Sequence, residues 1–440
     1  MRDLDKIDYL CAVNILNNDI MKRFIGMVAL VASAVLSAVA QPEGKKIYIP
    51  RDLRNNDFSQ DSSQWSYSRM ACTKDFVVFW EKPYGNDLSK APALDGHDMT
   101  VDLPNLLEKL QTFYDYYRDS LRFILPGSKA DEYRMMAMIN YSLESTAYGG
   151  AYDDVIGALW ITPSRLRDRQ LNAVAHEVGH SFQSQIYCDG YPRGMNGAIY
   201  EMTSQWMLWH VNPLWMDDET YHWNDYRKLT HLRFLHSENR YHTAHVQEYW
   251  SEKRGLTVMA DLFRECKRHE DCAEAYMRHF GLSLDQMSDE MLDCACHILA
   301  MDYKRLKPLV SKYAFKIHTP AETDADGWMR PKEGYAPQIF GFDVFRLPVE
   351  GSGKLRVKVE SLTKPGEGGV RYALVMQDTS GNIIYGPRSG KQRDELQYSN
   401  DGIAAAYLVV LGAPAEYKTI NQRYNSAPRE QTFPFRFRVK

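Results

Sequence analysis

The stretch AHEVGHSFQSQ, residues 175–185, holds two histidines four positions apart, with a glutamate directly after the first. Residues 169–187 contain no proline, and four apolar residues share one helical stripe: Leu171, Val174, Val178 and Phe182. This spacing predicts a buried helix. On such a helix His176 and His180 lie one above the other, so both imidazoles can bind one tetrahedral ion.

Glu177 lies one step round the same helix. There it can reach a water on the ion without being a ligand, as a general base for metal-assisted hydrolysis must. The alternative is that His176, Glu177 and His180 are hydrogen-bonded core residues. A buried glutamate without a cation would be costly, which favours a zinc site.

Catalytic zinc needs a third protein ligand and an open fourth position. The best candidate is Glu201 in GAIYEMTSQWMLW, on a second helix. It is charged within an apolar run, where a carboxylate favours a nearby cation. The run comprises Ile199, Met202, Trp206 and Met207. The alternative is a solvent-facing residue that the helix dipole stabilises.

The composition is that of a packed globular protein. The 440 residues are 44% hydrophobic and 12% aromatic, and this length predicts about two or three domains. The formal charge of −4 gives no broad basic field, so nucleic acid is not an expected partner. The oligomeric state cannot be inferred from these features.

The N-terminus predicts export. Residues 21–41 read MKRFIGMVALVASAVLSAVAQ, which is typical of a secretory signal peptide cleaved after Ala40. Residues 1–40 are thus predicted to be an upstream extension, which reflects a start codon assigned too early, and a signal peptide. We expect a periplasmic or secreted protein without a membrane span after cleavage. An N-terminal helical anchor is the alternative.

Six cysteines follow the signal peptide: Cys72, Cys188, Cys266, Cys272, Cys294 and Cys296. An exported chain permits disulfides, but the spacing assigns no pairing, and free buried thiols are equally compatible with the sequence. The Cys-x-x-Cys spacing of cysteine zinc sites is absent.

The pattern along the mature chain predicts an α+β protein. We expect a helix over residues 101–124, strands over 133–143 and 155–161 with a Gly-Gly loop between them, and mostly helices over 197–305. The predicted domains are 41–318, a catalytic domain, and 335–440, a β-sandwich. Residues 319–337 form the approach to the second domain.

His176, Glu177, His180 and Glu201 resemble the zincin metallopeptidases of the gluzincin branch. DVIGALWITPS, AHEVGHSFQ, YEMTSQW and RYHTAHVQEYW together are similar to an uncharacterised family of secreted bacterial proteins regarded as zinc metallopeptidases. The resemblance implies a zincin fold: a mixed sheet over the active-site helix, a helical half and a cleft between them. It also implies that residues 155–161 are the edge strand that aligns an extended peptide.

Two further positions follow from this resemblance. Many gluzincins carry an aspartate four residues beyond the glutamate ligand, where this chain has Gln205. An amide accepts from an imidazole more weakly than a carboxylate does. Gluzincins also place a tyrosine or histidine across the cleft to stabilise the oxyanion. Tyr241 is the first candidate for this role and His242 the second, and either residue could instead be plain packing.

The resulting hypothesis is an exported zinc endopeptidase. His176, His180 and Glu201 hold Zn²⁺, and Glu177 acts as general base toward the zinc-activated water. The substrate is a peptide or protein, and abundant aromatic residues leave a glycoprotein open. The alternative is a glycan- or protein-binding module on a non-catalytic zincin scaffold. The retained Glu177 argues against it, because a site that only binds metal needs no base.

Overall fold

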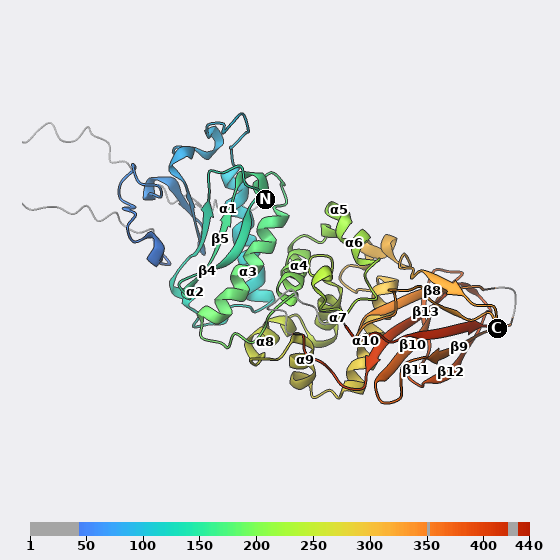
Figure 1. Ribbon diagram of the computed structural model, residues 1–440. Coiled ribbons are helices and arrows are strands. Elements are labelled where there is room, and N and C mark those ends of the chain that lie inside the picture. Colours follow the sequence, from blue (N-terminus) through green and yellow to red (C-terminus); the bar gives the residue numbers. More distant parts are fainter. Residues whose placement is uncertain (1–43, 350–352, 421–429) are drawn as a thin grey trace, which may run out of the picture. The chain divides into compact units, whose positions relative to one another are not determined.

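The computed structural model describes residues 44–349, 353–420 and 430–440 (Figure 1). The predicted signal peptide and upstream extension lie outside these residues. The chain divides into two compact units, Met1–Arg118 with Ile124–Asp189, and Asp119–Phe123 with Gly190–Lys440. The predicted domain boundaries differ from this division and stay a prediction. Among the described residues, each helix is too short or too polar to cross a bilayer.

The first unit is built on a mixed five-stranded sheet of order β1-β2-β3-β5-β4. β2, β3 and β5 run parallel, whereas β1 and β4 pair antiparallel with their neighbours. β2 and β3 are apolar and buried throughout, as strands covered on both faces must be. The strands are β1 (Met70–Cys72), β2 (Phe76–Trp80), β3 (Met135–Ile139), β4 (Ala147–Tyr152) and β5 (Ile156–Ile161).

The sheet confirms two predicted strands and corrects two other predictions. β3 and β5 occupy the two expected segments. The expected Gly-Gly loop is instead part of β4, since Gly149 and Gly150 pair with Leu159 and Ala158 of β5. β5 is therefore an interior strand, and β4 lies at the edge.

Three helices pack with this sheet. α1 (Leu103–Asp115) begins at Asp102, whose carboxylate accepts from the Asn105 N–H at 3.1 Å. A π-helical turn follows at Tyr116–Ser120, so the α-helix is shorter than predicted. The short α2 (Lys129–Glu132) precedes β3. α3 (Asn172–Cys188) is the predicted motif helix, and it contacts α1, β4 and β5 (Figure 1).

The N-terminus of α3 takes its capping group from a neighbouring turn. Leu171 at the N-cap is left-handed, with φ 56°, and offers no capping side chain. The Asp168 carboxylate replaces it by accepting from the Asn172 N–H at 2.9 Å. Further along the helix, the Phe182 ring packs edge-on against Tyr114 and Tyr117 of the α1 segment. These contacts fix both the start of α3 and its buried face.

Two glycines let the backbone of α3 approach the sheet closely. A Cβ at Gly149 in β4 would collide with the Glu177 carbonyl oxygen and lie 2.7 Å from His180 Cβ. A Cβ at Gly157 in β5 would lie 2.7 Å from the Ser181 carbonyl oxygen. Both strands therefore require a residue without a side chain where the motif helix crosses them.

The second unit begins with the expected helical segment. α4 (Ile199–Val211) follows the motif helix in sequence and contacts α7. Its other helices are α5 (Trp215–Asp218), α6 (Thr220–Tyr226), α7 (His245–Arg254), α8 (Val258–Glu265), α9 (Cys272–Phe280), α10 (Leu284–Ala300) and α11 (Lys307–Val310).

Two antiparallel sheets complete this unit, as the alternating strands predicted. One has the order β11-β10-β13-β8 and the other β12-β9-β14-β7-β6. β6 and β7 fall inside the predicted approach segment. The strands are β6 (Ala321–Thr323), β7 (Met329–Pro331), β8 (Phe342–Leu347), β9 (Lys354–Ser361), β10 (Gly368–Asp378), β11 (Ile383–Ser389), β12 (Arg393–Ser399), β13 (Ile403–Pro414) and β14 (Phe435–Val439).

One buried carboxylate joins the helices of the second unit to its C-terminal segment. Asp271 caps α9 by accepting from the Ala273 and Glu274 N–H groups. Its Oδ2 also accepts from the Tyr417 hydroxyl at 2.7 Å and from Arg233 Nη2 at 3.3 Å. Arg233 is buried too, so each charge compensates the other.

The six cysteines among the described residues are buried. Cys266, Cys272, Cys294 and Cys296 are free thiols, so for these four the structure shows the thiol alternative. Burial raises the pKa of Cys266 to about 12, which keeps this thiol protonated at neutral pH.

We expect Gly149→Ala to destabilise the mature chain, residues 41–440, by about 1–3 kcal/mol, because the new methyl group overpacks the contact between β4 and α3. Urea unfolding measures the change. Gly150→Ala is the matched control, since a Cβ there meets only side-chain atoms, the nearest being Tyr148 Cε1 at 3.3 Å. Equal stability of the two variants would contradict the close approach.

We expect Asp271→Ala to destabilise the chain by about 2–3 kcal/mol, because it removes the closer of the two carboxylates that pair with the buried Arg233, the other being Glu430 at 3.6 Å. Asp285→Ala removes an exposed ion pair with Arg371 and should cost at most about 1 kcal/mol. Urea unfolding of both variants tests the assignment, and a small effect at Asp271 would refute it.

Candidate metal centre

The two motif histidines present their Nε2 atoms to each other. These atoms lie 3.1 Å apart, and the two rings are inclined at 85°. Two nitrogens that bind one tetrahedral zinc ion at 2.0–2.1 Å lie about 3.3 Å from each other. His176 and His180 therefore have the separation that one shared ion requires.

Gln183 orients the second of these histidines. Its Oε1 lies 3.0 Å from His180 Nδ1, and an amide oxygen only accepts, so Nδ1 carries the proton. The lone pair is then on Nε2, which faces His176. Ligand histidines commonly hold such a partner on the other ring nitrogen. Gln183 was not singled out from the sequence, although a glutamine three positions after His180 shares its helix face.

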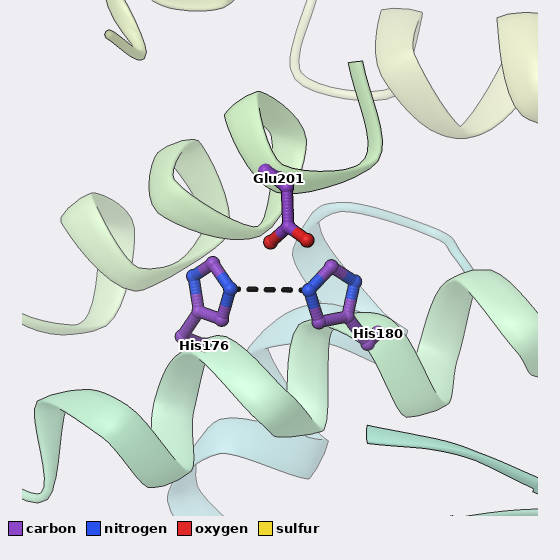
Figure 2. Close-up of side chains that lie close together, drawn as sticks. All are labelled: His176, His180 and Glu201. Atoms are coloured by element: carbon purple, nitrogen blue, oxygen red, sulfur yellow. Dashed lines mark hydrogen bonds between the residues drawn. The ribbon is translucent and has the colours of Figure 1, made fainter. Parts of the chain in front are cut away.

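Glu201 completes a group of three potential ligands. One ligand atom from each of His176, His180 and Glu201 lies within 4.8 Å of the other two. Figure 2 shows the carboxylate facing both imidazoles. His176 is buried, whereas His180 and Glu201 are half-buried. All three predicted ligands thus belong to one cluster of a composition suited to zinc.

Glu177 follows His176 on α3 and is half-buried. Its backbone carbonyl accepts from the Ser181 hydroxyl at 3.0 Å, and the same hydroxyl contacts the Ala158 carbonyl of β5 at 2.8 Å. The turn of α3 that carries the predicted base is therefore held by the sheet. Its role as general base stays a prediction.

Tyr241 contacts the third ligand directly. Its hydroxyl donates to Glu201 Oε1 at 3.2 Å, and its side chain is 39% exposed. The residue lies in the turn between the 3₁₀ helix Ser237–Asn239 and α7. The Arg240 guanidinium lies 5.1 Å from the centre of the Tyr241 ring. Its predicted role toward an oxyanion stays a prediction.

His242, the second candidate for that role, pairs with another histidine. Its Nδ1 lies 3.2 Å from Nδ1 of His222 on α6. Burial lowers the pKa of His242, and the nearby His222 lowers it further. The ring is therefore mainly neutral at pH 7, which allows one nitrogen to accept a hydrogen bond.

Gln205, which stands where many gluzincins have an aspartate, contacts the turn that carries Tyr241. Its Nε2 donates to the Tyr241 carbonyl oxygen at 2.8 Å and lies 3.3 Å from His222 Nε2. Glu219 Oε2 also lies 3.2 Å from that His222 nitrogen. The amide group of Gln205 is thus used by the backbone of the turn that carries Tyr241.

An ion pair between the buried Glu248 and the half-buried Arg305 holds the α4 helix that carries Glu201. Glu248 accepts two hydrogen bonds from Arg305, at 3.0 and 2.8 Å, and one from Trp206 Nε1 at 3.1 Å. Arg305 also donates to the Trp209 carbonyl oxygen at 3.1 Å. No local sequence pattern signals this pair, because its two residues are 57 positions apart in the chain.

Two other histidines of this unit, His210 and His245, are core residues. Burial lowers the pKa of His245 to about 3, and it also holds the pKa of His210 well below its usual value. Both rings pack against buried aromatic side chains. They therefore remain neutral over the physiological pH range.

Residues 39–440 match the model of a family described as "Family of unknown function (DUF6055)". No curated protein matches the sequence significantly. Among solved structures, the ZmpB metallopeptidase from Clostridium perfringens is 14% identical, with a TM-score of 0.33 over 84% of this chain and 69% of that chain.

A second solved structure is described as accessory secretory protein 1,2 and 3 in Streptococcus pneumoniae. It is 11% identical, with a TM-score of 0.16 over 29% of this chain and 87% of that chain. At these TM-scores neither structure assigns a fold to this chain.

We expect Gln183→Leu to weaken the binding of zinc by about 10- to 100-fold, because His180 Nδ1 loses the acceptor that orients its ring. Gln183→Glu keeps an acceptor and should retain most of the affinity. Competition with a chromophoric chelator measures the Kd of the mature chain. Equal affinity in the parent and Gln183→Leu would show that this bond does not tune the site.

Proposed function

The chain belongs to the DUF6055 family over residues 39–440, and from its own residues we propose that it is a zinc-dependent metallopeptidase. The cluster of His176, His180 and Glu201 carries this proposal, because its ligand atoms lie within 4.8 Å of one another. Two imidazoles and one carboxylate are the protein ligands of known catalytic zinc sites, which keep a fourth position open.

We propose a zincin-like arrangement for the catalytic part and a β-sandwich for the C-terminal sheets. The mixed sheet and the α3 helix that packs on β4 and β5 support the first. The ring contacts of Phe345 in β8 with Phe435 and Phe437 in β14, at 5.9 and 4.6 Å, support the second. These rings join the two antiparallel sheets.

In the proposed reaction the chain's own residues hold the metal and move the proton. His176 and His180 bind through Nε2 and Glu201 binds through its carboxylate. When bound, zinc supplies Lewis-acid chemistry, which polarises a carbonyl and lowers the pKa of water. Glu177 removes a proton from the attacking water as the new C–O bond forms. It then delivers this proton to the amine nitrogen as the C–N bond breaks.

Tyr241 is the proposed donor to the oxyanion that develops on the substrate carbonyl. Its phenol already lies beside the site, with the hydroxyl on Glu201 Oε1 at 3.2 Å. A phenol has one O–H donor, so in the proposed reaction it would turn from Glu201 Oε1 to the neighbouring oxyanion. His242 is the second candidate, and its contact with His222 makes it the less direct one.

The edge strand β4 is the proposed guide for an extended peptide. One side of β4 pairs with β5, and the strand ends the sheet order, so its other backbone edge is available for a further strand. Gly149 brings this edge beside His180 on α3. A peptide bound along a strand edge extends on both sides of the cleaved bond, which favours endopeptidase activity.

The proposed place of action is the periplasm or the cell exterior, on the basis of the predicted signal peptide. The proposed substrate is a peptide or protein, with a glycoprotein as the narrower possibility. A binding module for glycans or proteins is the competing function. Metal analysis combined with a cleavage assay distinguishes it from a peptidase.

We expect the mature chain to bind one zinc ion and to cleave casein. Glu177→Gln should retain zinc and lose activity by at least about 10²-fold, because the proton acceptor is gone. Glu201→Ala should weaken zinc binding. Metal analysis and a fluorogenic casein assay measure both properties.

Glu108→Gln on the exposed face of α1 is the matched control and should behave like the parent. Stoichiometric zinc without cleavage of casein or of a glycoprotein such as mucin would favour the binding module. A well-folded parent that binds no zinc would refute the metal site itself.

A further inference from the structure

We infer that Gln205 is a positioning residue for the metal centre. Its side chain holds the turn of residues 237–242, so that the Tyr241 hydroxyl stays on Glu201. The inference rests on the proposed function for its catalytic meaning, but the contacts themselves belong to the second unit alone.

The geometry of α4 places Gln205 one turn after Glu201. Residues four positions apart lie on the same face of a helix, so both side chains reach toward the same neighbour. Gln205 is 3% exposed, and its Nε2 donates to the Tyr241 carbonyl oxygen at 2.8 Å. A buried amide group in this position cannot exchange that partner for bulk water without opening the structure.

Tyr241 is therefore held at both ends by one face of α4. Its backbone carbonyl accepts from Gln205, and its phenol donates to Glu201 at 3.2 Å. The bonds form a closed ring of three residues, Glu201, Gln205 and Tyr241, in which only Tyr241 comes from another segment. Without these two bonds the Tyr241 side chain, which is 39% exposed, would sample several rotamers. Ordering it at the site would then cost more side-chain entropy.

A second contact steadies the same turn from α6. Gln205 Nε2 has two hydrogens, and it lies 3.3 Å from Nε2 of His222, whose Nδ1 is 3.2 Å from His242 Nδ1. The His242 N–H also donates to the Asn239 carbonyl at 3.0 Å within the turn. The His222 nitrogen is shared with Glu219, so the shorter bond to Tyr241 is the one that carries the inference.

This geometry explains why position 205 holds an amide. The Tyr241 carbonyl oxygen only accepts hydrogen bonds, so its partner must be a donor. A carboxylate at this position would place two acceptors against each other inside the protein. Gln205 therefore stands where many gluzincins have an aspartate because its amide donates a hydrogen bond to the backbone of the turn that carries Tyr241.

Gln205 and Tyr241 therefore hold the carboxylate of Glu201, the proposed third ligand, in place before a metal binds. The Tyr241 hydroxyl on Oε1 restrains the rotation of the Glu201 carboxylate and leaves Oε2 able to bind a metal. Groups that orient a metal ligand typically change metal affinity by about 10- to 100-fold when removed. Gln205 acts on the metal through Tyr241, so its effect should vanish when the phenol hydroxyl is absent.

The test is a double-mutant cycle on the full mature chain with Gln205→Met, Tyr241→Phe and the combined variant. We expect each single variant to raise the Kd for Zn²⁺ by about 10-fold, and the combined variant to show the same 10-fold and not a 100-fold change. Chelator competition measures the Kd. Multiplicative effects, or an unchanged Kd in Gln205→Met, would overturn the inference.

Gln247→Met is the matched control, because Gln247 is also a buried glutamine of this unit but has both amide atoms without a partner. It should leave the Kd unchanged. If Gln205→Met does not fold, Gln205→Glu keeps the size and removes the donor, and it should weaken zinc binding at least as much.

Hydrogen exchange separates this inference from the proposed function. In the zinc-free chain, exchange over residues 237–244 should speed up in Gln205→Met and stay unchanged in Gln247→Met. A parent that binds zinc but cleaves nothing would defeat the peptidase proposal and leave the cycle intact. A parent that binds no zinc would defeat the metal site, and unchanged exchange in Gln205→Met would then defeat the positioning role as well.

Discussion

The close contact between the motif helix α3 and the strands β4 and β5 is the constraint on which the candidate site depends. Gly149 and Gly157 remove the side chains that would separate helix from sheet, so the backbone of β4 lies against the turn that carries Glu177 and His180. A residue with a Cβ would push the strand away from both. The sheet thus holds the helix that supplies two of the proposed ligands and the proposed base, and among the described strands β4 ends the sheet beside them.

The proposed third ligand, Glu201, depends on a different kind of support. α4 is fixed by the pair of the buried Glu248 and the half-buried Arg305, which bonds the helix through Trp206 and the Trp209 carbonyl. A buried carboxylate is costly without its partners, so Glu248 favours the one placement of the helix that keeps them. Glu201 and Gln205 then share a face of that fixed helix, and both contact Tyr241. A catalytic metal site benefits from this rigidity, because its ligands need little reorganisation when an ion binds.

The C-terminal sheets are more closely tied to the helices than alternating strands suggest. A run of β-strands after a helical region is typical of a separate domain. Here Asp271 at the start of α9 binds Tyr417 and the buried Arg233, and α10 contacts β10 and β13. The helices and the sheets fall within one compact unit. No local pattern signals these contacts, because they join residues from 38 to 146 positions apart.

Local periodicity determined much of the candidate site. The helical repeat placed His176 and His180 on one face, and a charge within an apolar run singled out Glu201, since both signals act over a few residues. The tertiary structure decided what lies opposite them. Gly149 and Gly150 looked like a loop, because glycine more often ends a strand than serves a close helix contact. The bonds from Gln205 to the Tyr241 backbone and from the Tyr241 phenol to Glu201 join segments about forty residues apart. No local pattern encodes such pairs, because they form only when the fold closes the intervening chain.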